Sequence, residues 1–267
     1  MNIRDLFEKY GIKPKKSLGQ NFLTDGNALN KIIKEADIKK SDVVLEIGPG
    51  LGILTKELSK KAKKVIAVEK DDNLFKVLKQ ELKDHSNVEV VNRDILGYDP
   101  RLKEYKVIAN LPFNIASAVI RKFLEAKNPP EEMILMVQKE VAQRITAEPP
   151  DMTVLSLSVQ LYAEPKTLFF ISRNSFLPHP KVDAAVLRIA TKSNIALMQN
   201  NAKIFFKIAK AGFSSPRKQL ANNLSSGLKE EKEKVIKWLI ENNIEPTRRA
   251  ETLTVQEWMS LARNILD

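Results

Sequence analysis

A short glycine-rich segment is the first part of the chain whose residue types suggest chemistry. It reads EIGPGLG over residues 46–52. An apolar run at 43–48 precedes it and predicts a buried parallel strand, and an amphipathic helix is predicted over 53–62. Glycines at such a junction permit turns that a Cβ atom would block, and they let a ligand approach the backbone closely. The segment therefore predicts a ligand-binding loop.

Two carboxylates stand at the ends of the next predicted strands. Glu69 lies in the strand predicted at 65–70, 21 residues after Gly48, and Asp94 ends the strand predicted at 88–94. A carboxylate at the position of Glu69 can accept hydrogen bonds from both hydroxyls of a ribose, and Asp94 can accept one from an adenine amine. The three strand ends together predict a site for a ligand that contains a nucleoside.

Two ligands of this class fit. A dinucleotide requires G-x-G-x-x-G, whereas Gly48, Gly50 and Gly52 form G-x-G-x-G. An acid two residues before the first glycine, as Glu46 is, is more typical of S-adenosylmethionine (SAM) sites. We therefore favour SAM over a nicotinamide cofactor. A glycine turn without any ligand is the remaining alternative, and the agreement of three strand ends disfavours it.

Asn110-Leu111-Pro112-Phe113 ends a fourth predicted strand at 105–112. Proline stops strand pairing, so these residues could simply terminate the strand. The chemical interpretation is an adenine-methylating site. The Asn110 side-chain oxygen and the Leu111 carbonyl would hold the two hydrogens of an adenine amine, whose lone pair is otherwise delocalised into the ring. Pro112 would stiffen the turn, and Phe113 would stack on a flipped base.

Composition excludes other kinds of chemistry. The 267 residues include no Cys and only two His, which excludes a disulfide framework, a Cys nucleophile and a His or Cys metal cluster. No apolar run reaches about 18 residues, so no membrane span is predicted. The start of the chain does not resemble a signal peptide. We expect a cytoplasmic protein that needs no metal.

The elements that position these residues alternate as in an α/β sheet. Helices are predicted at 27–38 and 73–84, a fifth strand at 133–139, and an antiparallel pair at one edge at 167–172 and 183–190. The pattern predicts a Rossmann-like domain over 1–192, with a basic N-terminal arm at 1–25 and a loop-like stretch at 13–26. Helical periodicity begins near 201, so 193–267 is predicted as a small all-helical domain.

The formal net charge of +11 is concentrated at the two ends of the chain. Residues 1–40 carry a net charge of +4 and residues 188–267 a net charge of +6, whereas residues 41–187 carry only +1. Basic groups bind phosphates by displacing counterions, so this distribution predicts a near-neutral catalytic body between two RNA-binding ends. Any single basic residue could instead be an ordinary solvated surface charge with no RNA partner.

The order of the motifs resembles that of the ribosomal RNA adenine dimethyltransferases over nearly the whole chain. The motifs that carry the resemblance are KSLGQNFL (16–23), EIGPGLG (46–52), VIAVEKD (65–71), NLPFNI (110–115), MVQKEVAQRI (136–145), FLPHPKVDAAVLRI (176–189) and FSSPRKQLANNL (213–224). The resemblance implies SAM-dependent dimethylation of two adjacent adenosines near the 3′ end of 16S rRNA. It also implies that the partner is an immature 30S subunit and that the enzyme is a monomer.

The resemblance also implies roles for single residues. Those that would bind the cofactor are Asn21, Leu23, Gly48, Gly50, Glu69, Asp94 and Asn110. Asn110, Leu111, Pro112 and Phe113 would form the catalytic segment, and Phe176 would be a second stacking face opposite Phe113. Phe176 could instead be an ordinary core aromatic.

The chain departs from the family at two places. Phe113 stands where bacterial members usually have Tyr, which removes a phenolic hydrogen bond but keeps stacking. The loop expected after the QKEV helix reads AEPPDMTVLSLSV at 147–159 and lacks the usual Gly and Tyr. Two other functions stay open: an RNA-binding ribosome assembly factor with secondary methylation, and a macrolide-resistance methyltransferase that acts on 23S rRNA.

Overall fold

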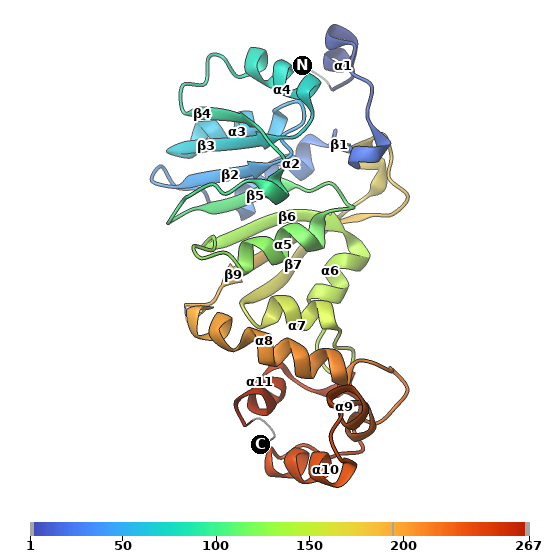
Figure 1. Cartoon of the computed structure of the whole chain (residues 1–267). Helices are drawn as coiled ribbons and strands as arrows, with labels where there is room; N and C mark the ends of the chain where they lie inside the picture. The colour runs from blue at the N-terminus through green and yellow to red at the C-terminus, as the bar shows by residue number, and fades with distance from the viewer. Residues whose placement is uncertain (1–2, 194, 265–267) are drawn as a thin grey trace. The chain divides into compact units, whose positions relative to one another are not determined.

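The chain forms two compact units. The structure, a computed structural model, describes residues 3–193 and 195–264 (Figure 1). The first unit comprises residues 1–142 and 166–191, and the second comprises residues 143–165 and 192–267, as far as these are described. Residues 143–165, which the sequence analysis included in the first domain, group with the helices of the second unit.

The first unit is built on a seven-stranded sheet with the order β4-β3-β2-β5-β6-β9-β7. Its strands are β2 (Val43–Ile47), β3 (Lys64–Glu69), β4 (Val88–Asn92), β5 (Lys106–Asn110), β6 (Glu132–Gln138), β7 (Ala163–Ile171) and β9 (Ala184–Thr191). The first five are parallel to one another, and β9 runs antiparallel to β6. The predicted parallel α/β sheet is confirmed, and its last two strands lie together at one edge.

Helices cover both faces of this sheet (Figure 1). They are α2 (Gly26–Glu35), α3 (Ile53–Lys61), α4 (Asp72–Glu81), α5 (Ala116–Leu124) and α6 (Lys139–Ile145), with short 3₁₀ turns η2 (Ile95–Gly97) and η3 (Arg173–Ser175). The chain moves in opposite directions from β2 to β3 and from β5 to β6, so right-handed crossovers place α3 and α5 on opposite faces. This topology brings the carboxyl ends of the parallel strands to one edge.

Apolar side chains of the parallel strands fill the core between the sheet and helices α2 and α3. Val44, Ile108 and Ile134 from the sheet pack with Ile32 of α2 and Leu58 of α3, and each is at most 2% exposed. Branched apolar residues fit such a two-sided burial, which explains the continuous apolar runs of the sequence. The core therefore holds the strand ends rigidly.

The basic N-terminal arm contains regular structure on both sides of its loop segments. It contains α1 (Ile3–Tyr10), the 3₁₀ turn η1 (Lys16–Leu18) and β1 (Phe22–Leu23), which pairs antiparallel with β8 (Phe176–Leu177). The buried side chains Ile3, Leu6 and Phe22 form an apolar cluster with Leu74 and Val77 of α4. The stretch 13–26, predicted as loop-like, is irregular apart from η1 and β1, and the helix α1 before it helps to dock the arm through its buried apolar side chains.

The second unit is helical among its described residues beyond the end of β9. Its helices are α7 (Val154–Gln160), α8 (Ile195–Gly212), α9 (Leu220–Leu228), α10 (Lys232–Glu241) and α11 (Val255–Arg263), with the 3₁₀ turn η4 (Ala250–Thr252). Trp258 is fully buried and stacks on Phe213, with ring centroids 5.6 Å apart. The helical character predicted for the C-terminal part of the chain is present in α8 to α11. The segment 147–159, predicted as a loop, contains most of α7, which begins at a capping box of Thr153 and Ser156.

Within residues 3–193 and 195–264, the structure contains no helix with the length and apolar character needed to cross a bilayer.

Replacing Gly227 by Ala tests the packing of α8 against α9. A Cβ atom at Gly227 would lie 2.6 Å from the Ala211 Cβ atom and 2.8 Å from its Cα atom. Alanine favours helix by about 1 kcal/mol, but separating two packed helices costs about 1–3 kcal/mol, so we expect a net loss of stability. Thermal unfolding measures the change. Gly26→Ala is the control, because no atom lies within 4 Å of its added Cβ. A Gly227→Ala protein more stable than the wild type would contradict this packing.

Candidate active site

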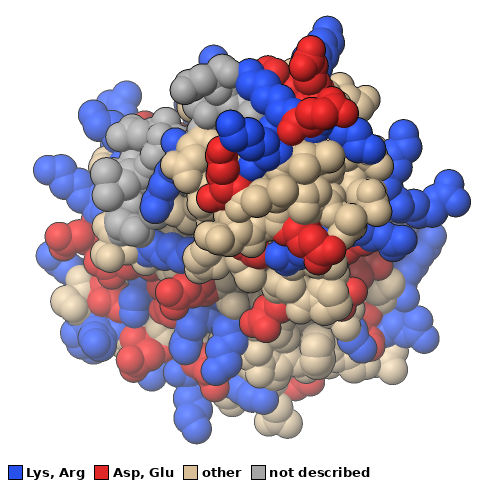
Figure 2. Space-filling view, turned by 90° about the horizontal axis from the view of Figure 1, so that it is seen from below, with Lys and Arg blue, Asp and Glu red and all other residues tan. Residues whose placement is uncertain are grey.

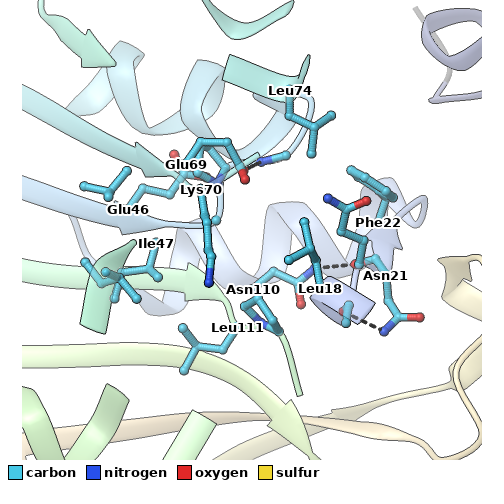
Figure 3. Close-up of a pocket in the computed structure, with 18 of the residues that line it drawn as sticks. Leu18, Asn21, Phe22, Glu46, Ile47, Glu69, Lys70, Leu74, Asn110 and Leu111 are labelled. Carbon is cyan, nitrogen blue, oxygen red and sulfur yellow. Dashed lines mark hydrogen bonds between the residues drawn. The ribbon is translucent and has the colours of Figure 1, made fainter. Parts of the chain in front are cut away.

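A pocket opens at the carboxyl ends of β2, β3 and β5, and the N-terminal arm forms its other wall (Figure 3). All seven residues predicted to bind a cofactor line it: Asn21, Leu23, Gly48, Gly50, Glu69, Asp94 and Asn110. Leu111 and Pro112 of the predicted catalytic segment line it as well. The structure therefore brings together residues from five separate sequence motifs.

The glycine loop between β2 and α3 adopts a backbone that favours glycine. Gly48, Gly50 and Gly52 have φ angles of +65°, +61° and +77°. A Cβ atom on Gly50 would lie only 2.9 Å from the Phe22 ring of the arm. The Gly50 N–H group donates a hydrogen bond to Glu69 Oε2 over 3.2 Å. The loop is thus held between the arm on one side and the end of β3 on the other.

Glu69 ends β3 and is 6% exposed. Its Oε1 atom accepts a hydrogen bond from the Asp71 N–H group over 2.8 Å, while Oε2 accepts the one from Gly50. Burial raises the pKa of this carboxyl to about 7, although both hydrogen bonds act to lower it. Each oxygen keeps a further lone pair, so the carboxylate can still accept two hydrogen bonds from one ligand.

Glu46 is the site residue that the sequence analysis used only as a motif position. It is 1% exposed, and burial raises the pKa of its carboxyl to about 8, with a further contribution from the Glu69 charge. The Thr55 hydroxyl is near enough to lower this pKa, but Glu46 Oε2 has no hydrogen-bond partner of good geometry. A buried acceptor without a partner is costly, so this corner of the pocket suits a cationic or hydrogen-bond-donating ligand group.

Asp94 follows β4 and is paired within the protein. Its Oδ1 atom accepts a hydrogen bond from the Leu96 N–H group, and its Oδ2 atom lies 2.8 Å from Lys70 Nζ. The Lys70 ammonium and the Leu96 N–H group hold the pKa of Asp94 below its ordinary value. Lys70 follows the last residue of β3, and its side chain lines the pocket (Figure 3). Sequence reasoning missed Lys70, although its position directly after Glu69 is a usable signal.

Asp71 fastens the arm to the pocket. Lys15 Nζ lies 2.8 Å from Asp71 Oδ2, and the Gln20 side-chain amide donates to the same oxygen over 3.1 Å. Burial alone would raise the pKa of Asp71, but the bonds from Lys15 and Gln20 lower it below the ordinary value. Asp71 Oδ1 also accepts from the Asn73 N–H group and caps α4. Lys15, predicted to contact RNA, therefore has an internal partner.

Asn110 lies at the end of β5 with its side chain held by the arm. Its Nδ2 group donates to the Asn21 carbonyl over 2.8 Å, so its Oδ1 atom is directed elsewhere and is available to accept (Figure 3). The Leu111 N–H group donates to the Met136 carbonyl over 3.2 Å, and a turn closes from Ile115 N–H to Pro112 over 3.1 Å. The backbone of this segment is therefore fixed on both sides of Leu111.

The two predicted stacking rings are placed differently from the expectation. Phe176 is fully buried in the core beside α2 and α3, and Phe113 is partly buried against the same core. Neither residue lines the pocket. In this conformation Phe176 presents no exposed ring face, so a role in stacking would require it to move.

Within residues 3–193 and 195–264, no three His, Cys, Asp or Glu side chains are grouped as they would be around a metal ion.

Comparisons with known proteins point to one family. Residues 11–265 match the family model described as "Ribosomal RNA adenine dimethylase". A protein of Dehalococcoides mccartyi named "Ribosomal RNA small subunit methyltransferase A" is 44% identical over 264 residues, which cover 97% of this chain and 90% of that protein. A protein of the same name from Bacillus mycoides is 39% identical over 277 residues, covering 98% of this chain and 95% of that one.

Solved structures agree. A dimethyladenosine transferase from Plasmodium falciparum superposes with a TM-score of 0.80 at 27% identity, covering 90% of this chain and 95% of that chain. The 23S rRNA methyltransferase ErmE superposes with a TM-score of 0.75 at 26% identity, covering 91% of this chain and 98% of that chain. Sequence, fold and pocket agree, and the chain belongs to the ribosomal RNA adenine dimethylase family.

Proposed function

We propose that this enzyme, a SAM-dependent rRNA adenine dimethyltransferase, dimethylates the N6 amines of two adjacent adenosines near the 3′ end of 16S rRNA in an immature small subunit. The observation that carries the proposal is a single pocket that is lined by the buried carboxyls Glu46 and Glu69 and by the fixed amide of Asn110. The small-subunit names of the relatives at 39–44% identity favour 16S over 23S rRNA.

The chemistry of SAM matches the groups that line the pocket. SAM carries an ammonium group and a ribose diol, and both need hydrogen-bond acceptors. Glu46 Oε2 is a buried acceptor without a partner, and Glu69 keeps a free lone pair on each oxygen. Asp94 would accept from the adenine amine, sharing its Oδ2 atom with Lys70. When bound, SAM supplies a methyl group that is electrophilic because it is attached to a sulfonium.

The chain's own contribution to the reaction is positioning and charge. An adenine amine is a weak nucleophile until it becomes pyramidal, and two acceptors that hold its hydrogens favour that shape. Asn110 Oδ1 and the Leu111 carbonyl are the acceptors, and the bond from Asn110 Nδ2 to Asn21 keeps the amide oriented. The amine proton becomes acidic once the methyl group has added and leaves to water. Such preorganised acceptors stabilise the transition state without a strong base.

The aromatic residues would hold the target base once it leaves its helix. Phe113, next to Pro112, would stack on one side of the base. Phe176 would serve as the other side only after a rearrangement that exposes its ring, since it is fully buried here. Because Phe113 lacks the phenolic hydroxyl of the family's usual Tyr, its contribution would be stacking alone.

The RNA contacts would come from exposed basic residues for which the described part of the chain holds no ion-pair partner. Arg217, Lys218 and Arg249 are exposed, whereas Arg248 pairs with Glu257. On the face seen in Figure 2, basic side chains lie around the rim and alternate with acidic ones. Dispersed charges of this kind suit contacts to the phosphates of a folded RNA rather than the reading of its sequence.

The target is tested directly on ribosomal particles. Immature 30S particles from cells that lack the modification are incubated with the enzyme and SAM, and their 16S rRNA is digested and analysed by mass spectrometry. We expect two adjacent adenosines to gain two methyl groups each. Mature 50S particles are the control and should gain none. Methylation of 23S rRNA with unmodified 16S rRNA would refute the assignment.

Replacing Asn110 by Ala tests the acceptor role. The change removes Oδ1 and the bond to Asn21, so we expect kcat to fall about 10²- to 10³-fold, the range typical for loss of one preorganised polar group. The KM for SAM should change less than tenfold. Asn30→Ala, which removes an exposed amide from α2, is the matched control. Near-normal turnover of Asn110→Ala would show that the amine is oriented by other groups.

Replacing Glu46 by Gln tests the cost of the buried acid pair. The pKa values of Glu46 and Glu69 are raised to about 8 and about 7, so the folded protein binds more protons than the unfolded chain between about pH 5 and pH 8. Its stability should therefore fall as the pH rises through this range. Ligand-free Glu46→Gln should match the wild type near pH 5 and exceed its free energy of unfolding by on the order of 2–4 kcal/mol at pH 8.

Urea unfolding at both pH values measures this difference, and calorimetry should show weaker SAM binding by the same variant. Glu8→Gln, which changes an exposed carboxyl of α1, is the control. A stability difference between Glu46→Gln and the wild type that is the same at pH 5 and pH 8 would contradict the raised pKa.

A further inference from the structure

An exposed aromatic ring lies on the edge strand β7, outside the pocket. Phe170 is 53% exposed, whereas its neighbour Phe169 packs against the core. Successive strand residues face opposite sides of a sheet, so the two rings lie on opposite faces. A single exposed apolar side chain is ordinary on a protein surface, and the surroundings of Phe170 decide whether it has a role.

One cationic side chain lies over this ring, and two more follow β7 in the chain and are connected to it by hydrogen bonds. Lys139 Nζ lies 5.1 Å from the centroid of Phe170. Arg173 and Lys181 are exposed and joined, because Arg173 Nη1 donates to the Lys181 carbonyl over 3.2 Å. Asp183 ties them to Lys139: its carbonyl accepts from the Lys139 N–H group over 2.9 Å, and its Oδ1 atom accepts from the Arg173 N–H group over 3.0 Å. We call Phe170, Lys139, Arg173 and Lys181 the Phe170 platform.

The platform stands at the same edge of the sheet as Asn110. The end of β5 is joined to the end of β6, where Asn110 pairs with Met136, and Gln138 of β6 pairs with Ala184 of β9. In the order β5-β6-β9-β7, three strand spacings of about 4.8 Å separate the end of β5 from that of β7, or about 14 Å. Stacked bases are about 3.4 Å apart, so one RNA strand would cover this distance with about four nucleotides.

We propose that the Phe170 platform binds an unpaired base of the substrate RNA within about four nucleotides of the target adenosine. The base stacks on Phe170, and Lys139, Arg173 and Lys181 hold the adjoining phosphates. Single-stranded RNA is bound in this way by exposed aromatic rings flanked by cations, and the net positive charge of the platform suits a polyanion. This inference rests on the proposed function, because it concerns the same RNA strand.

Kinetics on immature 30S particles test the platform. Phe170→Ala should raise the KM for the particle about tenfold, whereas kcat at saturation and the Kd for SAM should stay within twofold of the wild type. Phe170→Tyr should restore the KM, because Tyr also stacks. Lys139→Gln should raise the KM and reduce its salt dependence. Ile240→Ala, at a side chain that is 59% exposed on α10, is the control and should behave as the wild type.

A photoreactive phenylalanine analogue at position 170 identifies the partner. A cross-link to 16S rRNA close to the methylated adenosines supports the proposal. A cross-link to a ribosomal protein, an unchanged KM for Phe170→Ala, or a failure of Phe170→Tyr to restore the KM would overturn it. Absence of methylation by the wild-type enzyme would instead refute the proposed function, so the two failures are distinguishable.

Discussion

The hydrogen bond from the Gly50 N–H group to Glu69 Oε2 joins the two parts of the structure on which the pocket depends. It links the loop after β2 to the end of β3, and it requires the left-handed backbone that the three glycines of this loop adopt. Burial raises the pKa of this carboxyl to about 7, and the bond from Gly50 partly offsets that rise. Burying this carboxyl is unfavourable, and the packed core beneath the strand ends holds it in place nevertheless.

The N-terminal arm forms one wall of the pocket, and several contacts hold it there. Phe22 lies against Gly50, Asn21 accepts from the Asn110 side chain, and Lys15 and Gln20 hold Asp71. The arm therefore connects the glycine-loop side of the pocket with the Asn110 side. A substitution that displaces the arm would therefore alter the contacts on both sides of the pocket, because its apolar and polar contacts belong to one packed segment.

Charge has two uses in this chain. Part of the basic excess at the N-terminus is neutralised within the protein, since Lys9 and Lys15 pair with Glu81 and Asp71. Other cations, such as Arg173 and Lys181, are exposed at the edge of the sheet where the strands end. Net charge alone cannot distinguish the paired cations from the exposed ones. The distance from each cation to its nearest carboxylate can, because a carboxylate within about 3 Å competes with any phosphate.

The sequence by itself predicted the parallel sheet and the glycine loop, and its motifs included the seven residues expected to bind a cofactor, all of which line the pocket. These features follow from local patterns, such as apolar runs, glycine spacing and acids at strand ends, and each pattern lies within a few residues. Only the tertiary structure decided that the arm is docked, that Phe176 is buried, that Glu46 has an oxygen without a partner and that residues 143–165 group with the helical unit. The physical reason is that burial and pairing depend on residues far apart in the chain, such as Lys15 and Asp71, and no local pattern records their approach.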